Sequence, residues 1–136
     1  MRARLTKDFT FEAAQTLPNV PEGHKCRGLH GHSFKVEVSV EGDVDPKTGW
    51  VYDHAEISDA MKPLLKMLDH KYLNDIEGLE NPTIEKNGRM VLEKIRVSMS
   101  RPLRDRRARN TDSALRLSRR VNGTTACRRS HRLTTR

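Results

Sequence analysis

Hydrophobic and polar residues alternate along two segments near the beginning of the chain. In residues 30–41, every second position is a histidine or an apolar residue, and the positions between them are mostly charged or carry hydroxyl groups. The residues that share the first of these faces are His30, His32, Phe34, Val36, Val38 and Val40. Successive side chains of a strand point to opposite faces, so this period of two predicts a half-buried strand. Residues 3–15 alternate in the same way and predict a first strand that pairs antiparallel with residues 31–41.

A helical period follows these two segments. After residue 53, apolar residues recur at spacings of three and four, and they are Ile57, Met61, Leu64, Leu65 and Leu68. This stripe predicts an amphipathic helix that packs its apolar side on the sheet. Asp53 is the expected N-cap of that helix. Asn81 and Pro82 predict the start of a second helix, because proline is favoured at the first helical position.

Charge divides the chain after Glu85. Residues 1–85 contain 10 basic and 15 acidic residues, whereas residues 86–136 contain 16 basic and 3 acidic residues. Fourteen of the 16 later basic residues are arginines, and no aromatic residue follows Tyr72. A segment so poor in large apolar residues is not expected to bury a core. One explanation is a disordered basic arm that binds nucleic acid.

A shift of reading frame is the other explanation for the basic segment. Read one nucleotide later, residues 86–92 are compatible with Arg-Thr-Ala-Glu-Trp-Phe-Trp, which is typical of an amphipathic helix. The same shift over residues 106–117 permits Val-Val-Arg-Glu-Thr-Pro-Thr-Ala-Leu-Tyr-Ala-Tyr, which is typical of a strand followed by an acidic motif. We therefore predict a folded domain over residues 1–85 and an out-of-frame, poorly ordered Arg-rich tail over residues 86–136.

The two histidines of the second predicted strand are candidates for metal binding. Burying His30 and His32 on an apolar face is costly unless each imidazole has a partner. A Zn²⁺ ion would supply that partner, and hydrogen bonds within the core are the alternative. Residue type and spacing alone leave both explanations open.

The cysteines and the hydropathy pattern indicate the cellular compartment of the protein. Cys26 lies in a long polar loop, residues 17–29, and the only other cysteine is Cys127. Two cysteines placed so differently do not indicate a disulfide framework, which suits a reducing cytosol. The sequence shows no signal peptide and no apolar run that could span a membrane. We therefore expect a cytoplasmic protein with no membrane partner.

Five motifs occur in a fixed order along the first 85 residues. They are Phe11-Glu-Ala-Ala-Gln15, Lys25-Cys-x3-His-Gly-His32, Leu68-Asp-His70, Leu73-Asn74 and Asn81-Pro-Thr-x-Glu85. With these motifs the chain resembles the 6-pyruvoyltetrahydropterin synthase superfamily. The three residues between the cysteine and the first histidine resemble its bacterial 6-carboxytetrahydropterin synthase branch, which acts in queuosine (7-deazaguanine) biosynthesis. The resemblance covers nearly all of residues 5–85.

The resemblance implies an α+β tunnelling fold, in which an antiparallel sheet carries two helices on one face. It also implies a homo-oligomer, a hexamer in the family, with active sites between subunits. The implied enzyme is a lyase that converts 7,8-dihydroneopterin triphosphate, a small-molecule substrate, to 6-carboxytetrahydropterin. Because of the unusual tail, we expect the C-terminal strands of that fold to be missing or disordered in this chain.

The resemblance also implies a ligand set for one Zn²⁺ ion. Three histidines hold the metal in the family, and His30 and His32 match two of them. Gln15 stands at the position of the third ligand, where an amide oxygen would be a neutral and weaker donor. The family's late glutamate, which grips the pterin ring, is missing, and Arg109 stands where the shifted frame would place it.

Catalytic roles are implied for three further residues. Cys26 matches the catalytic cysteine, which would remove a proton from the substrate side chain; the alternative is a small buried hydrophobe. His70 matches the charge-relay histidine and Asp69 its acidic partner. The alternative for His70 is a helix-terminal histidine that interacts favourably with the helix dipole.

Three functions are consistent with the sequence as a whole. The first is the zinc-dependent lyase, and the second is a basic protein that binds nucleic acid through its tail. The third is an inactive relic that cannot complete its fold. Family resemblance favours the first, and for the activity of this particular chain the third has equal weight.

Overall fold

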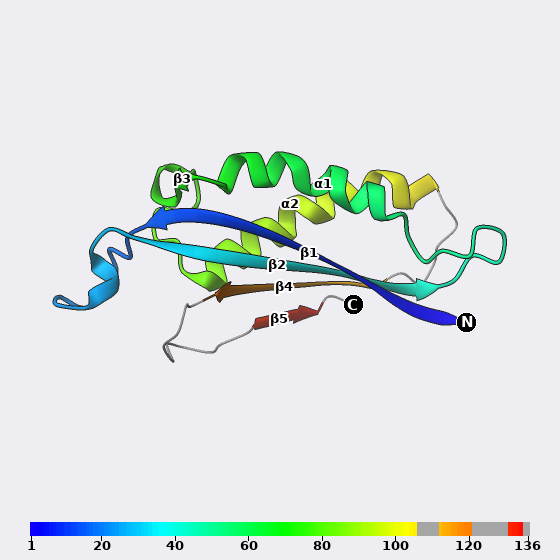
Figure 1. Cartoon of the computed structure of the whole chain (residues 1–136), viewed down its shortest axis with the longest axis horizontal. Helices are drawn as coiled ribbons and strands as arrows, with labels where there is room; N and C mark the ends of the chain where they lie inside the picture. The colour runs from blue at the N-terminus through cyan, green and yellow to red at the C-terminus, as the bar shows by residue number, and fades with distance from the viewer. Residues whose placement is uncertain (106–111, 121–130, 135–136) are drawn as a thin grey trace.

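The structure, a computed structural model, describes residues 1–105, 112–120 and 131–134. Its strands form one mixed sheet in the order β3-β1-β2-β4-β5 (Figure 1). The two long strands at its centre are β1 (Arg2–Gln15) and β2 (His30–Asp43). They pair antiparallel along their full length, from Arg2 opposite Asp43 to Gln15 opposite His30. The predicted hairpin is therefore confirmed.

Three shorter strands flank this pair. Strand β3 (Lys71–Tyr72) runs parallel to β1 and pairs with it at only two positions, Ala13 and Ala14. On the other side, β4 (Asp112–Arg120) pairs antiparallel with β2, and β5 (His131–Thr134) pairs antiparallel with β4. Among the described residues, most of β1 therefore has a strand on one side only.

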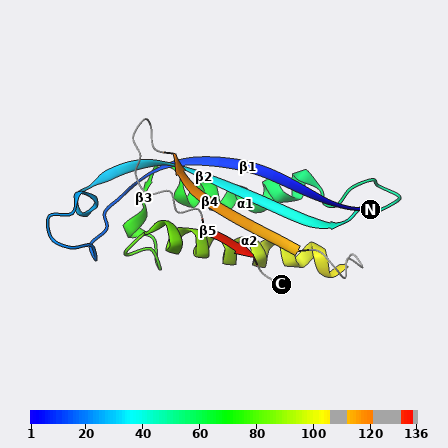
Figure 2. The ribbon, with the colours of Figure 1, turned by 90° about the horizontal axis from the view of Figure 1, so that it is seen from below.

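Two helices cover one face of the sheet, as the two perpendicular views show (Figures 1 and 2). Helix α1 (His54–Leu68) begins after Asp53, whose carboxylate accepts a hydrogen bond from the N–H of Ala55 at 2.8 Å. This confirms the predicted N-cap. No helix in the described part of the chain is long and apolar enough to cross a membrane.

Helix α2 (Ile84–Asp105) begins two residues later than its predicted start. The hydroxyl of Thr83 accepts the N–H of Lys86 at 3.4 Å, so Thr83 rather than Asn81 provides the side-chain cap. Pro82 lies before the helix instead of in its first turn. The side-chain oxygen of Asn81 instead accepts the N–H of Asn19 at 3.5 Å, which takes it away from the helix end.

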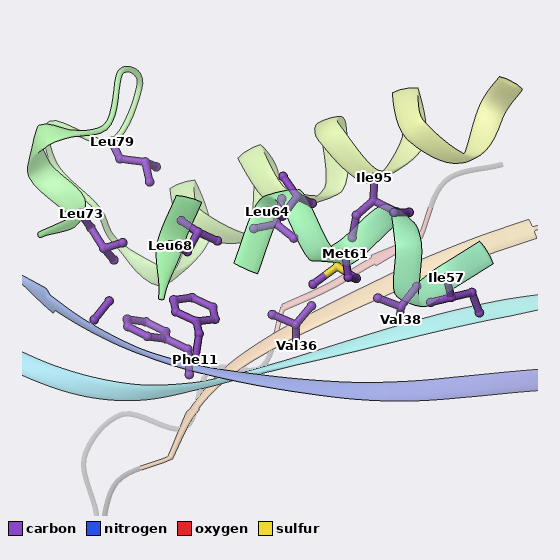
Figure 3. Close-up of a cluster of buried hydrophobic side chains, with 14 of the residues drawn as sticks. Phe11, Val36, Val38, Ile57, Met61, Leu64, Leu68, Leu73, Leu79 and Ile95 are labelled. Carbon is purple, nitrogen blue, oxygen red and sulfur yellow. The ribbon is translucent and has the colours of Figure 1, made fainter. Parts of the chain in front are cut away.

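The core lies between the sheet and the two helices (Figure 3). It is built from the apolar face of β2 and from the predicted stripe of α1, and all of the following side chains are buried: Phe34, Val36, Val38, Val40, Ile57, Met61, Leu64 and Leu68. Phe11 of β1 stacks on Phe34 with 4.7 Å between ring centroids. The period-two and helical patterns thus predict the side chains that are removed from water.

Two expectations for the second half of the chain are wrong. The strands expected to be missing or disordered are present as β4 and β5. Register explains β4, because Leu115 lies opposite Val38 and Leu117 lies opposite Val36, so that apolar positions coincide. The expected lack of a core beyond about residue 90 is contradicted by Val91 and Ile95, which are 0% and 4% exposed. In the sequence, the large excess of arginine over residues 86–136 obscured the local alternation of Leu115 and Leu117.

Candidate metal and catalytic site

The metal-ligand candidates meet at one end of the β1–β2 ladder. Gln15 lies opposite His30, and Ala13 lies opposite His32, so these side chains share one face of the sheet. The two imidazole rings are 4.7 Å apart and meet edge to face. The register therefore brings together all three residues that the sequence proposed as ligands.

The hydrogen bond made by His30 determines which of its nitrogen atoms could bind a metal. Its Nδ1 lies 2.8 Å from the carbonyl oxygen of Gly28. Because a carbonyl can only accept, Nδ1 carries the proton and Nε2 carries the lone pair. Nε2 is buried and has no hydrogen-bond partner among the described residues. A ring held through Nδ1–H with its Nε2 lone pair available is typical of a zinc-binding histidine.

Gln15 is the third member of this donor set. Its side chain is fully buried, at 0% exposed. Within the described residues, no third histidine, cysteine, aspartate or glutamate joins His30 and His32 in a potential metal site. The residues therefore fit Zn²⁺ with two strong donors and one weak amide donor.

Cys26 lies in a short 3-10 helix, η1 (Lys25–Arg27), within the loop that joins β1 to β2. Its side chain is half-buried and not in a disulfide. The backbone holds it in place twice: its carbonyl accepts the N–H of Leu17 at 2.9 Å, and its N–H donates to Nδ1 of His24 at 3.1 Å. The half-exposed position in a polar loop does not match the alternative of a buried hydrophobe.

Asp69 and His70 follow the last residue of α1 and contact β1. Oδ1 of Asp69 accepts the N–H of Glu12 at 2.9 Å and lies 3.0 Å from Nδ1 of His70. The N–H of His70 donates to the carbonyl of Glu12 at 2.6 Å. The hydrogen bond from Glu12, followed by that from His70, holds the pKa of Asp69 below its ordinary value. The carboxylate is therefore ionised and orients the imidazole.

The backbone of His70 adopts a left-handed conformation, with φ of +55°. This region is unfavourable for most residues with a side chain, although histidine tolerates it better than most. Its side chain is 79% exposed, so nothing buries it. Strain at an exposed residue next to a hydrogen-bonded carboxylate is typical of a functional position.

The loop between β1 and β2, which carries Cys26, and strand β3, which directly follows His70, lie at the same end of the sheet (Figure 1). Within the described part of one chain, no hydrogen bond or ion pair joins Cys26 to Asp69 or His70. Glu85 is exposed in the first turn of α2, where the sequence placed it. Arg109 and Cys127 lie outside the described residues.

A polar cluster beside the site was missed by the sequence analysis. Asn74 makes four hydrogen bonds, three to Thr16 and one to the carbonyl of Glu80. The hydroxyl of Thr16 also bonds to that of Tyr72 at 2.9 Å. The Leu73-Asn74 motif was a signal for this cluster, but Asn74 and Thr16 are 58 residues apart and only the fold brings them together.

Comparison with known proteins agrees with this fold. Residues 4–128 match the family described as 6-pyruvoyl tetrahydropterin synthase, and the chain belongs to that family. It is 50% identical over 84 residues to a 6-carboxy-5,6,7,8-tetrahydropterin synthase from Synechocystis, in a match that covers 58% of this chain and 64% of that protein. It is 35% identical over 99 residues to a dihydroneopterin monophosphate aldolase from Pyrococcus furiosus, covering 73% and 80%.

A solved structure shows the same fold over the whole chain. The 6-pyruvoyl tetrahydropterin synthase of Caenorhabditis elegans superposes with a TM-score of 0.78, covering 100% of this chain and 97% of that one. At 22% identity this likeness establishes the architecture. The expected α+β fold of the pterin synthases, with two helices on one face of the sheet, is confirmed.

Proposed function

We propose that this chain is a zinc-dependent 6-carboxytetrahydropterin synthase. The reaction takes 7,8-dihydroneopterin triphosphate and water to 6-carboxytetrahydropterin, acetaldehyde and triphosphate. The observation that carries this proposal is the convergence, at one end of the sheet, of the His30–His32 pair, the Cys26 loop and the Asp69–His70 pair. The 50% identity to a Synechocystis protein of that name favours this branch over others.

The described residues suit the proton transfers that such a lyase requires. Cys26, on a half-exposed loop, acts as the base that takes a proton from the substrate side chain. His70, held by an ionised Asp69, exchanges a proton at its Nε2 atom, because Nδ1 faces the carboxylate. A zinc ion held by His30, His32 and Gln15 would polarise an oxygen of the substrate side chain as a Lewis acid.

We also propose that the site is shared between copies of the chain in a homo-oligomer. Two observations support this. Among the described residues of one chain, no hydrogen bond or ion pair joins Cys26 to Asp69 or His70, and most of β1 has an open edge. An open edge of this length pairs readily with another strand. Light scattering on the purified protein would give the mass of the assembly, and a monomer would contradict the shared site.

The place of this reaction in 7-deazaguanine biosynthesis rests on the branch resemblance. The 6-carboxytetrahydropterin product would supply the carbon skeleton of the deazaguanine ring. The sequence carries the spacing that favours this branch, with three residues between Cys26 and His30-Gly-His32.

Mass spectrometry of the reaction products tests the proposal directly. Purified protein supplied with Zn²⁺ and 7,8-dihydroneopterin triphosphate is expected to form 6-carboxytetrahydropterin and acetaldehyde. Cys26→Ser should lower kcat by roughly 100-fold, because an alcohol is a far weaker base than a thiolate at neutral pH. Cys127→Ser is the matched control and should retain turnover. Equal turnover in both variants, or no product from the unmodified chain, would contradict the proposal.

A further inference from the structure

The side-chain amide of Asn74 replaces a strand partner for Thr16. Oδ1 of Asn74 accepts the N–H of Thr16 at 2.9 Å, and Nδ2 donates to the carbonyl oxygen of the same residue at 2.9 Å. One side chain thus satisfies both backbone groups of Thr16, as a neighbouring strand would. Nδ2 also reaches the carbonyl of Glu80 at 3.1 Å, which fixes the amide from a third segment.

This contact begins where the backbone ladder ends. Strand β3 pairs with β1 at Ala13 and Ala14 only. Asn74 lies on the short 3-10 helix η2 (Leu73–Asp75) that follows β3. Its amide therefore extends the support of β1 by one further residue, up to Thr16.

Thr16 stands between two parts of the candidate site. The residue before it, Gln15, lies opposite His30 at the third-ligand position. The residue after it, Leu17, donates its N–H to the carbonyl of Cys26 at 2.9 Å. A rotation of the backbone at Thr16 would move both the end of β1 and the attachment of the cysteine loop.

We propose that Asn74 is a positioning residue that fixes the end of β1, so that Gln15 faces the histidine pair and Leu17 holds the loop of Cys26. The inference rests on the proposed function for the roles of Gln15 and Cys26. The part of the inference that concerns the backbone of Thr16 needs only the hydrogen bonds of Asn74. Asn74 acts on both residues through Thr16, to which it makes three hydrogen bonds.

The same cluster provides a matched control. Within the described part of the chain, the hydroxyl of Tyr72 bonds only to the hydroxyl of Thr16, at 2.9 Å. Tyr72→Phe therefore removes one hydrogen bond from the cluster and leaves the backbone of Thr16 bonded to Asn74. A general weakening of the cluster would lower kcat in both Tyr72→Phe and Asn74→Ala, whereas a positioning role predicts a loss of kcat in Asn74→Ala alone.

Amide hydrogen exchange and steady-state kinetics together test the proposal. In Asn74→Ala, the Leu17 amide is expected to exchange at least about tenfold faster, because the turn that holds it is released. Its kcat should fall at least about tenfold while KM changes less than about threefold, since misplaced catalytic groups slow the reaction more than they weaken binding. Tyr72→Phe should leave both the exchange rate and kcat close to those of the unmodified protein.

A second variant covers the case in which Asn74→Ala does not fold. Asn74→Asp keeps the shape and the acceptor for the Thr16 N–H, but it places an oxygen against the two carbonyls that Nδ2 now serves. It should show the same faster exchange of Leu17 and the same loss of kcat. Unchanged Leu17 exchange in the Asn74 variants, or equal losses in Tyr72→Phe, would overturn the inference. Absence of turnover in the unmodified chain would instead reject the proposed function, and the exchange rates would still decide the role of Asn74.

Discussion

Oδ1 of Asp69 lies 3.0 Å from Nδ1 of His70 and accepts the backbone N–H of Glu12 at the same time. The carboxylate is thereby fixed to β1, and the imidazole is fixed to the carboxylate. This arrangement sets the orientation of the imidazole ring.

Asp69→Asn is expected to reduce turnover while the protein still folds. An amide oxygen can keep the bond from Glu12, but it carries no charge to stabilise a protonated His70. We expect kcat to fall by roughly 100-fold, the usual contribution of a positioned acid–base group. Steady-state kinetics would measure this, with Asp59→Asn, an exposed carboxylate of α1 paired to Lys62, as the control. Similar activity in both variants would show that the pair has no catalytic role.

The lowered pKa of Asp69 predicts a pH-dependent stability. Its ordinary value is 3.8, and the hydrogen bonds from Glu12 and His70 lower it in the folded state. A group with a depressed folded pKa stabilises the protein above its unfolded pKa and loses that contribution as pH falls through the folded pKa. The free energy of unfolding should therefore fall more steeply below about pH 4 in the unmodified protein than in Asp69→Asn. Urea titrations at several pH values would show parallel curves if the carboxylate contributes nothing.

Replacing Gln15 should change the affinity for zinc. Gln15 lies opposite His30 on the shared face, so a histidine there would add a third imidazole to the pair. We expect Gln15→His to tighten zinc binding by at least about tenfold, because imidazole is a stronger zinc ligand than an amide oxygen. Competition with a chromophoric chelator would measure the affinity. Ala14→His is the matched control, because the neighbouring position points to the opposite face and should leave the affinity unchanged.

The sequence predicted those parts of the fold that depend on local pattern. The alternation of apolar and polar residues predicted which side chains of β1 and β2 share a face, and so predicted that Gln15 and His30 lie on the same face of the sheet. The short parallel strand β3 has no pattern of its own, since it consists of two residues that gain their partners only from β1. The hydrogen bonds of Asn74 connect segments that are 58 residues apart, so residue spacing gives no signal for them. Strand β4 was missed because composition averaged over the whole tail concealed the short alternation that places Leu115 and Leu117 on one face.

Asn87 is an unfavourable residue for its place in α2. It is 1% exposed, and both polar atoms of its amide are buried without a hydrogen-bond partner in the described residues. Asn87→Leu should therefore raise the free energy of unfolding by about 1–2 kcal/mol, since it removes the desolvation penalty and adds apolar burial. Urea denaturation would measure the gain. Arg89→Ala, which removes an exposed ion pair to Glu93, is the control and should change stability by less than about 1 kcal/mol.

The region around Asn87 also motivates a prediction about the gene. Asn87 and the buried Gly88 lie two and three residues after Glu85, the point where the charge and the kind of basic residue change. Helix α2, which contains them, also has Pro102 in its interior, a residue that interrupts helical hydrogen bonds. The alternative frame replaces Asn87 and Gly88 by threonine and alanine, which are better suited to a buried helix face. We therefore expect resequencing of the gene to reveal one missing or additional base near codon 86.

In the corrected frame, an acidic residue would stand near position 109, and the protein should unfold cooperatively at a higher urea concentration than the present chain. If the sequence is confirmed as it stands, the arginine-rich segment is a true part of the protein, and β4 and β5 belong to a divergent member of the family.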